Sequence, residues 1–272
     1  MGSWARSVGE DSTARPYAHG GLHLAVVGKG GAGKSVIAGT LARTFARRGA
    51  RVLALDSDPM PGLASSLGAT TPEDPPLLAA GERPEGGRWQ VRKGIGPIRA
   101  IQLYTTPAPD GVLLLEAGKT PEEGGAAIQG ATSSFYELVQ RIRKTPSLQD
   151  WTLVGDLSAG PRQPSYRWAD YANMFLLITE PNWKSGLAAR RIARIIRDRG
   201  DVPIRLVANK ITRRSDEQAV ADMVREPVFT TVPADEAVAA AERAGVPLLD
   251  HAPSSPAALA IERLADRLSS GA

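Results

Sequence analysis

Cysteine is absent from this 272-residue sequence. Disulfide bonds, thiolate metal sites, iron–sulfur clusters and a cysteine nucleophile are therefore excluded. Histidine is nearly absent as well, because the chain has only His19, His23 and His251. These three are scattered along the sequence, two of them near its start, so a metal site built from histidines is disfavoured.

Long hydrophobic runs are also missing, and none approaches the length that spans a bilayer. The first twenty residues are polar and lack the apolar segment of a signal peptide. We expect residues 1–20 to be a disordered leader and the protein to be cytoplasmic, without stable membrane insertion. With 42% hydrophobic residues, we expect residues 21–272 to bury one large core as a single domain.

A strong excess of one charge is the third missing feature. The 33 basic residues outnumber the 29 acidic ones by only four, which gives a net charge of +4. This balance is too mild to indicate a nucleic-acid ligand by itself, and an ordinary solvated surface explains it.

A glycine-rich run, Gly-Lys-Gly-Gly-Ala-Gly-Lys-Ser, is present at 28–35. It matches the phosphate-loop pattern G-x-x-x-x-G-K-[ST] and lies between an apolar run at 22–27 and a helical pattern at 34–48. Its glycines let successive N–H groups face phosphate oxygens, while Lys34 would reach the β- and γ-phosphates and Ser35 would ligate Mg²⁺. The predicted nucleotide-binding residues are Gly28, Gly30, Gly31, Ala32, Gly33, Lys34 and Ser35.

Short apolar or β-branched runs alternate with helical patterns along the chain. This alternation indicates an α/β fold with a doubly wound, mainly parallel sheet flanked by helices. Further strands are predicted at 51–56, 152–156, 173–179, 204–209 and 228–232. Helices are predicted at 133–144, 185–199, 216–225, 235–244 and 256–268.

The composition shifts to Pro, Gly and Glu at about 69–110. Only the pieces at 89–92 and 99–103 resemble strands. We interpret this part as a loop-rich excursion or β-ribbon on the core, and not as a second domain.

Aspartates follow two of the predicted strands, at the sheet edge where open α/β folds gather their ligand-binding groups. Asp56 and Asp58 lie in an Asp-Ser-Asp-Pro run, and Asp156 ends the strand at 152–156. Carboxylates in these places can serve Mg²⁺ or a water molecule. The Asp-Ser-Asp-Pro run is equally compatible with a helix cap and turn. For Asp156, the position relative to the phosphate loop favours function over a structural role.

The base of the nucleotide can be inferred from the run Asn-Lys-Ile-Thr at 209–212. A guanine-reading Asn-Lys-x-Asp motif needs a final carboxylate that accepts from the base, and Thr212 lacks one. We therefore expect adenine, with the Asn209 amide pairing with its edge.

Lys29 is not needed to build the loop, because one lysine already serves the phosphates. The spacing G-K-G-G-x-G-K-S resembles the deviant Walker A motif of the family that includes the nitrogenase iron protein, septum-site and plasmid-partition ATPases, arsenite-pump ATPases and the carbon monoxide dehydrogenase nickel-insertion ATPase. The resemblance implies an ATPase that uses ATP and Mg²⁺ and forms a homodimer on ATP binding. It also implies that Lys29 crosses the dimer interface and acts like an arginine finger on the other subunit's nucleotide.

Two further segments resemble the switch regions of this family, most closely those of the nickel-insertion ATPase. The resemblance implies that Asp58 orients the attacking water and that Asp56 holds the magnesium shell. Asp156, with the Leu-Ser-Ala-Gly that follows it, resembles the Walker B and switch II segment. The predicted catalytic residues are thus Lys29, Lys34 and Asp58, and the predicted metal-binding residues are Ser35, Asp56 and Asp156.

The chain departs from the family pattern at Met60, Gly62 and Ser158, where relatives are more polar or acidic. This departure bears on the control of hydrolysis. The run at 232–238 resembles the family's adenine-side loop entering a helix, with Pro233 near the ring. A simple helix N-terminus with an acidic first turn explains the same run.

The segment that would reveal the target of the ATPase lies at 112–131. It resembles the strand and Gly-rich loop that lead to a Cys-x-Cys metal site in the nickel-insertion ATPase, but it has Ala, Ile and Gln there. Without cysteine, a thiolate metallochaperone and a cluster-bearing reductase are both chemically excluded.

The predicted helix at 185–199 is rich in arginine. Its basic residues are Arg190, Arg191, Arg194, Arg197 and Arg199. They suit acidic partners or nonspecific DNA, as basic faces do in partition ATPases. A solvated amphipathic helix explains the pattern too, with Leu187, Ile192, Ile195 and Ile196 turned inward.

Three functions fit the sequence. The favoured one is an ATP-binding and ATP-hydrolysing dimerisation switch that acts on a protein client, resembling metalloenzyme maturation ATPases without their metal ligands. The second is a partition or positioning ATPase whose ATP dimer binds DNA or a cargo assembly. The third is an ATP-binding scaffold with little turnover. Nucleic acid is therefore a partner that the sequence permits but does not favour.

Overall fold

The computed structural model describes residues 21–58, 62–70, 72, 74, 76–118, 125–142, 144–160, 169–198, 200 and 202–270, with side chains in the helix at 125–142 from 129 onward. The leader predicted at 1–20 lies outside these residues. So do Pro59, Met60, Arg199 and most of the Gly-rich loop before 125.

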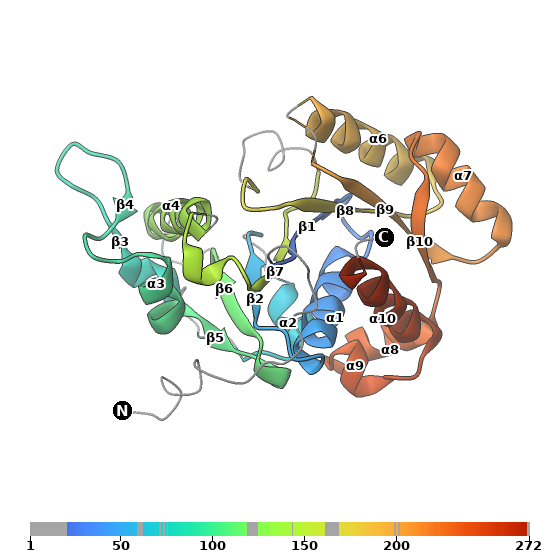
Figure 1. Ribbon diagram of the computed structural model, residues 1–272, viewed down its shortest axis with the longest axis horizontal. Helices are drawn as coiled ribbons and strands as arrows, with labels where there is room; N and C mark the ends of the chain where they lie inside the picture. Colours follow the sequence, from blue (N-terminus) through green and yellow to red (C-terminus); the bar gives the residue numbers. More distant parts are fainter. Residues whose placement is uncertain are drawn as a thin grey trace.

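One eight-stranded sheet forms the centre of the molecule, in the order β10-β9-β8-β1-β7-β2-β6-β5 (Figure 1). The strands are β1 (His23–Gly28), β2 (Val52–Asp56), β5 (Thr106–Pro107), β6 (Leu113–Glu116), β7 (Thr152–Asp156), β8 (Met174–Thr179), β9 (Ile204–Ile211) and β10 (Val228–Pro233). All neighbouring pairs are parallel except β5 with β6, which is antiparallel. Strand β1 lies between β7 and β8. The later strands β8, β9 and β10 therefore extend the sheet from β1 in the direction opposite to β2. Open α/β sheets bind ligands at such a switch point in the strand order.

Helices cover both faces of the sheet (Figure 1). One apolar core contains side chains of α1 (Lys34–Arg47), α2 (Leu63–Leu67), α8 (Glu236–Ala244), α9 (Leu248–His251) and α10 (Pro256–Ser269). The other contains those of α3 (Pro97–Tyr104), α4 (Gly125–Ile142), α6 (Trp183–Arg197) and α7 (Arg214–Val224). Each strand of the inner sheet therefore buries both of its faces, as its nearly continuous apolar sequence predicts.

The predicted excursion at 69–110 contains short elements. They are the 3₁₀ helix η2 (Pro76–Ala80), the antiparallel ribbon of β3 (Gly81–Glu82) and β4 (Gln90–Val91), and helix α3. The ribbon projects from one end of the molecule in Figure 1. Two more 3₁₀ turns, η3 (Pro109–Gly111) and η4 (Pro146–Leu148), precede β6 and β7.

The strand predicted at 99–103 is wrong, because these residues lie inside helix α3. Pro97 occupies the first turn of this helix, where its missing N–H costs nothing, and the adjacent Ala100 and Ile101 are buried against the core. Helix α4 begins at Gly125, well before the predicted start at 133. The small residues before 133 gave no apolar period from which this first part could be read.

A buried arginine joins elements around the core that contains α1, α9 and α10. Arg43, on α1, donates from Nε to Asp110 at 2.6 Å and from its two terminal nitrogens to Asp250 at 2.5 and 2.8 Å. These bonds connect α1 to η3 and α9, and the Arg43 guanidinium holds the pKa of Asp250 below its usual value. No helix in the described part of the chain is long and apolar enough to cross a membrane.

Candidate functional site

The glycine-rich run at 28–35 forms the turn from β1 into α1, as the motif predicts. Gly33 immediately precedes α1 with φ 92° and ψ 21°, a left-handed conformation that suits glycine. A Cβ on Gly33 would lie 2.3 Å from the Asn209 amide nitrogen, so a side chain cannot be accommodated there. The first turn of α1 carries no acidic residue, which leaves its positive end open to an anion.

Lys34 and Ser35 begin α1 and face the end of β7. Lys34 is buried, and its charge acts to lower the pKa of Asp156. The Ser35 hydroxyl donates to Asp156 Oδ2 at 2.5 Å. The predicted Walker B aspartate therefore contacts the predicted magnesium serine directly.

Three carboxylates lie side by side at the ends of neighbouring strands. Asp56 is in register with Asp156 on one side and with Glu116 on the other, and all three are buried. Burial, and then the charge of Asp156, raises the pKa of Asp56 to about 8, although Asp56 accepts hydrogen bonds from the Asp58 and Leu63 amides at 3.0 Å. Burial raises the pKa of Asp156 to about 6. Such crowding of acids favours either protons or a cation.

A magnesium ion fits this donor set. Asp156 Oδ1 is buried and has no hydrogen-bond partner among the described residues, and Ser35 Oγ lies beside the same carboxylate. No group of three or more His, Asp and Glu side chains in the described ranges is arranged to hold a metal by itself. Phosphate oxygens and water would therefore supply the remaining ligands, which is usual for Mg²⁺.

The absence of a side chain at Gly62 leaves room beside the Ser35 hydroxyl. A Cβ on Gly62 would lie 3.1 Å from Ser35 Oγ, tighter than an ordinary contact. The sequence shows Gly62 only as a departure from the family pattern. In the structure its missing side chain keeps the front of Ser35 open.

Asn209 and Lys210 brace the loop from the end of β9. Asn209 Nδ2 donates to the Ala32 carbonyl at 2.8 Å. Lys210 Nζ donates to the Gly31 carbonyl at 2.8 Å and to Glu180 Oε1 at 2.6 Å. One amide hydrogen of Asn209 is thus used by the loop, so its predicted pairing with adenine would use the other hydrogen and the oxygen.

Residues 24–248 match the family model for the CobQ/CobB/MinD/ParA nucleotide binding domain. The chain belongs to this family. The match confirms the predicted family, the fold class and a P-loop nucleotide-binding protein of the MinD and ParA ATPase type.

Individual relatives agree with this membership. The chain is 30% identical over 239 residues to an uncharacterized ATP-binding protein of Methanocaldococcus jannaschii, covering 84% of this chain and 91% of that protein. It is 27% identical over 245 residues to the carbon monoxide dehydrogenase accessory protein CooC of Rhodospirillum rubrum, covering 86% and 91%. In structure it resembles the septum site-determining protein MinD of Pyrococcus horikoshii, complexed with Mg-ADP, with a TM-score of 0.70, 18% identity and coverage of 91% and 95%.

The characteristic second lysine of the loop, Lys29, is half-buried between β1 and α1. Its ammonium forms no ion pair with any carboxylate that the structure describes. Lys34, by contrast, is buried beside Asp156. The two lysines of the loop therefore have different surroundings.

The two segments predicted to be switches are joined to each other and to the glycine-rich loop. Ser57 Oγ donates to the Asp156 carbonyl at 3.0 Å, and Ser158 Oγ donates to the Ser57 carbonyl at 3.3 Å. The Gly160 amide donates to the Gly28 carbonyl at 3.0 Å. Ser158, a departure in the sequence, thus holds the switch segments together through a neutral hydrogen bond.

Asp58 and two tyrosines complete the surroundings of the carboxylates. Asp58 is half-buried, and its charge acts to raise the pKa of Asp156 and of Tyr136. Tyr171 is buried, and a Cβ on Gly155 would lie 1.6 Å from its hydroxyl. Sequence reasoning missed both tyrosines, although a glycine inside strand β7 signals such a close approach.

Pro233 is the last residue of β10 and is paired with Ile211 of β9. Ile211 lies two residues after Asn209. The following Asp235 accepts from the Ala237 amide at 2.9 Å, so it caps helix α8. The alternative prediction for this run, a helix N-terminus, is therefore confirmed for Asp235. A role of Pro233 beside adenine stays a prediction.

Proposed function

We propose that this protein is an ATP-dependent dimerisation switch that acts on a protein client. The observation that carries the proposal is the difference between the two loop lysines. Lys34 serves its own site beside Asp156, whereas Lys29 is half-buried with no ion pair to a described carboxylate. A cation held in this way is available to the nucleotide of a second subunit, as the family resemblance implies.

Each predicted residue then has a distinct task. Lys34 and the open N-terminus of α1 bind the β- and γ-phosphates. Ser35, Asp156 and Asp56 would hold Mg²⁺, which would neutralise charge on the phosphates when bound. Asp58 orients the attacking water, and Lys29 of the second subunit stabilises the charge that develops on the transferred phosphoryl group.

The hydrogen bonds between the loops connect the proposed hydrolysis site to the conformation of the switch segments. Gly160 is bonded to Gly28, and Ser158 is bonded to Ser57. A change in the contacts of the γ-phosphate would therefore move both switch segments together, as in other P-loop switches. The dimer would close on ATP, engage the client, hydrolyse and reopen.

We infer the kind of client from the residues of this chain and from its similarity to CooC. The relative CooC is an accessory protein of carbon monoxide dehydrogenase. This chain has no cysteine, so it would act on its client through shape and charge and not through thiolate metal transfer. We place it in the cytoplasm, where ATP is available.

Light scattering tests the switch. We expect the wild type to be a monomer without nucleotide and with ADP, and a dimer with Mg²⁺ and a non-hydrolysable ATP analogue. Lys29→Ala should stay monomeric while its ATP affinity changes less than about threefold, because Lys29 does not touch its own nucleotide. The control Lys93→Ala, at an exposed lysine outside the loop, should dimerise normally. A mass that ignores nucleotide would contradict the proposal and favour the scaffold.

A partition-type ATPase is the second candidate, favoured by the exposed arginines of α6. Its distinguishing property is DNA binding that requires ATP and weakens steeply with salt. A filter-binding assay with and without the ATP analogue separates it from a client-directed switch.

A further inference from the structure

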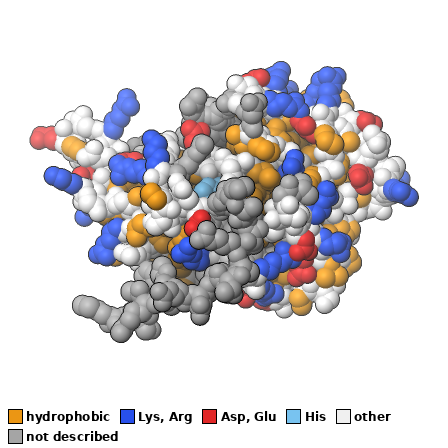
Figure 2. All heavy atoms as spheres, in the orientation of Figure 1, with side chains coloured by type: hydrophobic (Ala, Val, Ile, Leu, Met, Phe, Trp, Pro, Cys, Tyr) orange, Lys and Arg blue, Asp and Glu red, His pale blue; other side chains and the backbone are white. Residues whose placement is uncertain are grey.

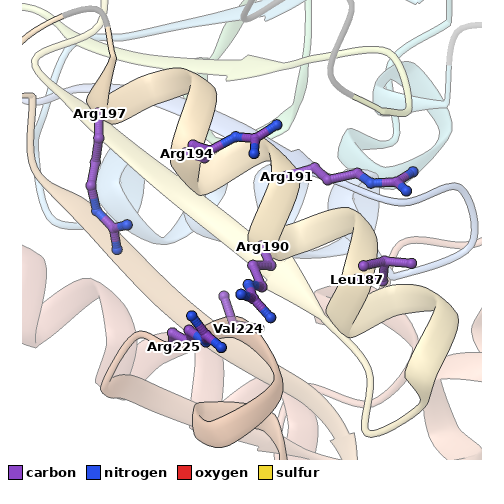
Figure 3. Close-up of a pocket in the computed structure, with 7 residues that line it drawn as sticks. All are labelled: Leu187, Arg190, Arg191, Arg194, Arg197, Val224 and Arg225. Atoms are coloured by element: carbon purple, nitrogen blue, oxygen red, sulfur yellow. The ribbon is translucent and has the colours of Figure 1, made fainter.

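A basic hollow is formed by side chains of α6 and the end of α7 (Figure 3). Its volume is about 500 Å³. It is lined by Leu187, Arg190, Arg191, Arg194, Arg197, Val224 and Arg225. Arg190 points from α6 toward the end of α7, where Arg225 and Val224 lie (Figure 3).

Most of these arginines are not neutralised. Arg197 pairs with Glu226, at the end nearest the α6 C-terminus. Arg190, Arg191, Arg194 and Arg225 are exposed, and none of them forms an ion pair with a carboxylate of the described chain. Several like charges around one hollow raise its positive potential, so the site attracts an anion.

An amphipathic helix explains only part of this arrangement. Ile192 and Ile196 are buried in the core, as the sequence predicts. Leu187 was also expected inward, but it is only half-buried and lines the hollow. Val224, at the end of α7, is the other apolar side chain that lines the hollow.

An exposed tryptophan extends the same helix face toward the nucleotide site. Trp183 begins α6, and 70% of its surface is exposed. It lies one turn before Leu187, so both side chains belong to one face. Figure 2 shows hydrophobic side chains mixed with Lys and Arg over this part of the molecule. Trp and Arg are the residues most enriched among the strong contacts of protein interfaces.

The tryptophan end of this face is connected to the phosphate loop. Asn182 caps α6 by accepting from the Ser185 amide at 2.9 Å, and its Nδ2 donates to Glu180 at 3.1 Å. Glu180 in turn accepts from Lys210, which donates to the Gly31 carbonyl. A partner held on α6 would therefore sit against the residues that brace the loop.

We propose that this face is the docking surface for an acidic segment of the client protein. The inference rests on the proposed function and adds the chemistry of the client. We call the surface the arginine face and define it by Trp183, Leu187, Arg190, Arg191, Arg194 and Arg225. Its occupant has several Asp or Glu side chains and one apolar side chain among them.

Two features favour an acidic protein segment over nucleic acid. Guanidinium groups bind carboxylates as two parallel hydrogen bonds, but they bind phosphates equally well, so the arginines alone do not decide. The half-buried Leu187 and the exposed Trp183 do decide, because a sugar-phosphate backbone has no apolar side chain to bury against them.

Fluorescence anisotropy on the nucleotide-free full chain tests the proposal. The probe is a labelled peptide of Glu residues around a central Leu, compared with the same peptide carrying Gln for Glu and with labelled duplex DNA. The test variant carries Arg190→Gln, Arg194→Gln and Arg225→Gln. The control variant carries Arg88→Gln, Lys93→Gln and Arg99→Gln, an equal loss of charge at exposed residues of the excursion.

The proposal predicts that the Glu peptide binds the wild type and the control variant and that the test variant binds it at least about tenfold more weakly. Trp183→Ala and Leu187→Ser should each weaken binding while leaving the charge unchanged. The Gln peptide should bind poorly. Tighter binding of the duplex than of the Glu peptide, equal loss in the control variant, or no binding of the Glu peptide would each overturn it.

These outcomes are separable from those of the switch itself. The test variant keeps Lys29, Lys34 and the carboxylates, so it should still dimerise with the ATP analogue. A failure of peptide binding with normal dimerisation would remove the arginine face and leave the switch standing. Loss of dimerisation in the wild type would instead remove the switch.

Discussion

Raising the pH should destabilise the nucleotide-free protein, and Asp56 is the main cause. This carboxyl is buried between Asp156 and Glu116, which raises its pKa from 3.8 to about 8. The folded state therefore binds a proton that the unfolded chain has already released above about pH 4. Each pH unit between these two pKa values lowers the free energy of unfolding by about 1.4 kcal/mol, and the loss levels off above about pH 8.

The size of the effect follows from this slope. Between about pH 6 and pH 8 the loss from Asp56 alone is about 2.3 kcal/mol, because the slope is full at pH 6 and falls to half at pH 8, where the carboxyl is half ionised. Asp156 adds little in this window, because its pKa is about 6 and its penalty has mostly developed at lower pH. For a chain of this size, about 2.3 kcal/mol corresponds to a fall in Tm of roughly 4–9 °C.

Scanning calorimetry at about pH 6 and pH 8 measures this fall in the wild type, in Asp56→Asn and in Asp150→Asn. Asp56→Asn has no titrating group at this position, so its Tm should fall much less. Asp150→Asn removes an exposed carboxyl and should keep the full wild-type fall. Mg²⁺ with ADP should reduce the fall in the wild type, because a cation stabilises the ionised carboxylates. An equal fall in Asp56→Asn and the wild type would refute this account of the site.

Three further predictions concern the core and the nucleotide. Arg43→Met should lower the free energy of unfolding by roughly 2–3 kcal/mol in urea denaturation, because it removes the three hydrogen bonds by which a buried guanidinium joins α1 to η3 and α9. Arg141→Met at an exposed pair should change it by less than about 1 kcal/mol; comparable losses would contradict the buried role. Gly62→Val should raise the Mg²⁺ concentration needed for half-maximal nucleotide binding by roughly tenfold, through a clash with Ser35 Oγ, and an unchanged Mg²⁺ titration would show that the space is not used. Asn209→Ala should reduce ATP affinity about tenfold more than GTP affinity in calorimetric titrations; equal losses would mean that Asn209 only braces the loop.

The sequence predicted the parts of the molecule whose residue pattern has a local cause. The buried parallel strands are continuous apolar runs, so β1, β2, β7, β8, β9 and β10 were placed within about two residues. The phosphate loop and the aspartate at the end of β7 were placed by spacing alone. The family follows from the second lysine of the loop, Lys29, which no structural requirement of the loop explains.

What the sequence could not show depends on contacts between distant residues. The register that places Asp56 between Glu116 and Asp156 is set by strand order, which joins β2 to β6 and β7. Lys210 was not predicted to brace the loop, because its reach to Gly31 depends on β9 and β1 being separated only by β8. The strand predicted at 99–103 failed for a similar reason, since a short apolar segment fits a strand or a helix until its packing partner is known.

Mixing two inactive variants is the most direct test of the claim that Lys29 acts on the other subunit's nucleotide. Lys29→Ala retains Asp58 at its own site, and Asp58→Asn retains Lys29. If Lys29 acts across the interface, a mixed dimer contains one complete site, made of Asp58 from one variant and Lys29 from the other. An equal mixture, at protein concentrations high enough to pair the subunits although one of them lacks Lys29, should recover ATPase activity, and random pairing sets the limit at about a quarter of the wild-type rate. ATPase activity of the mixture no higher than that of the separate variants would contradict the account.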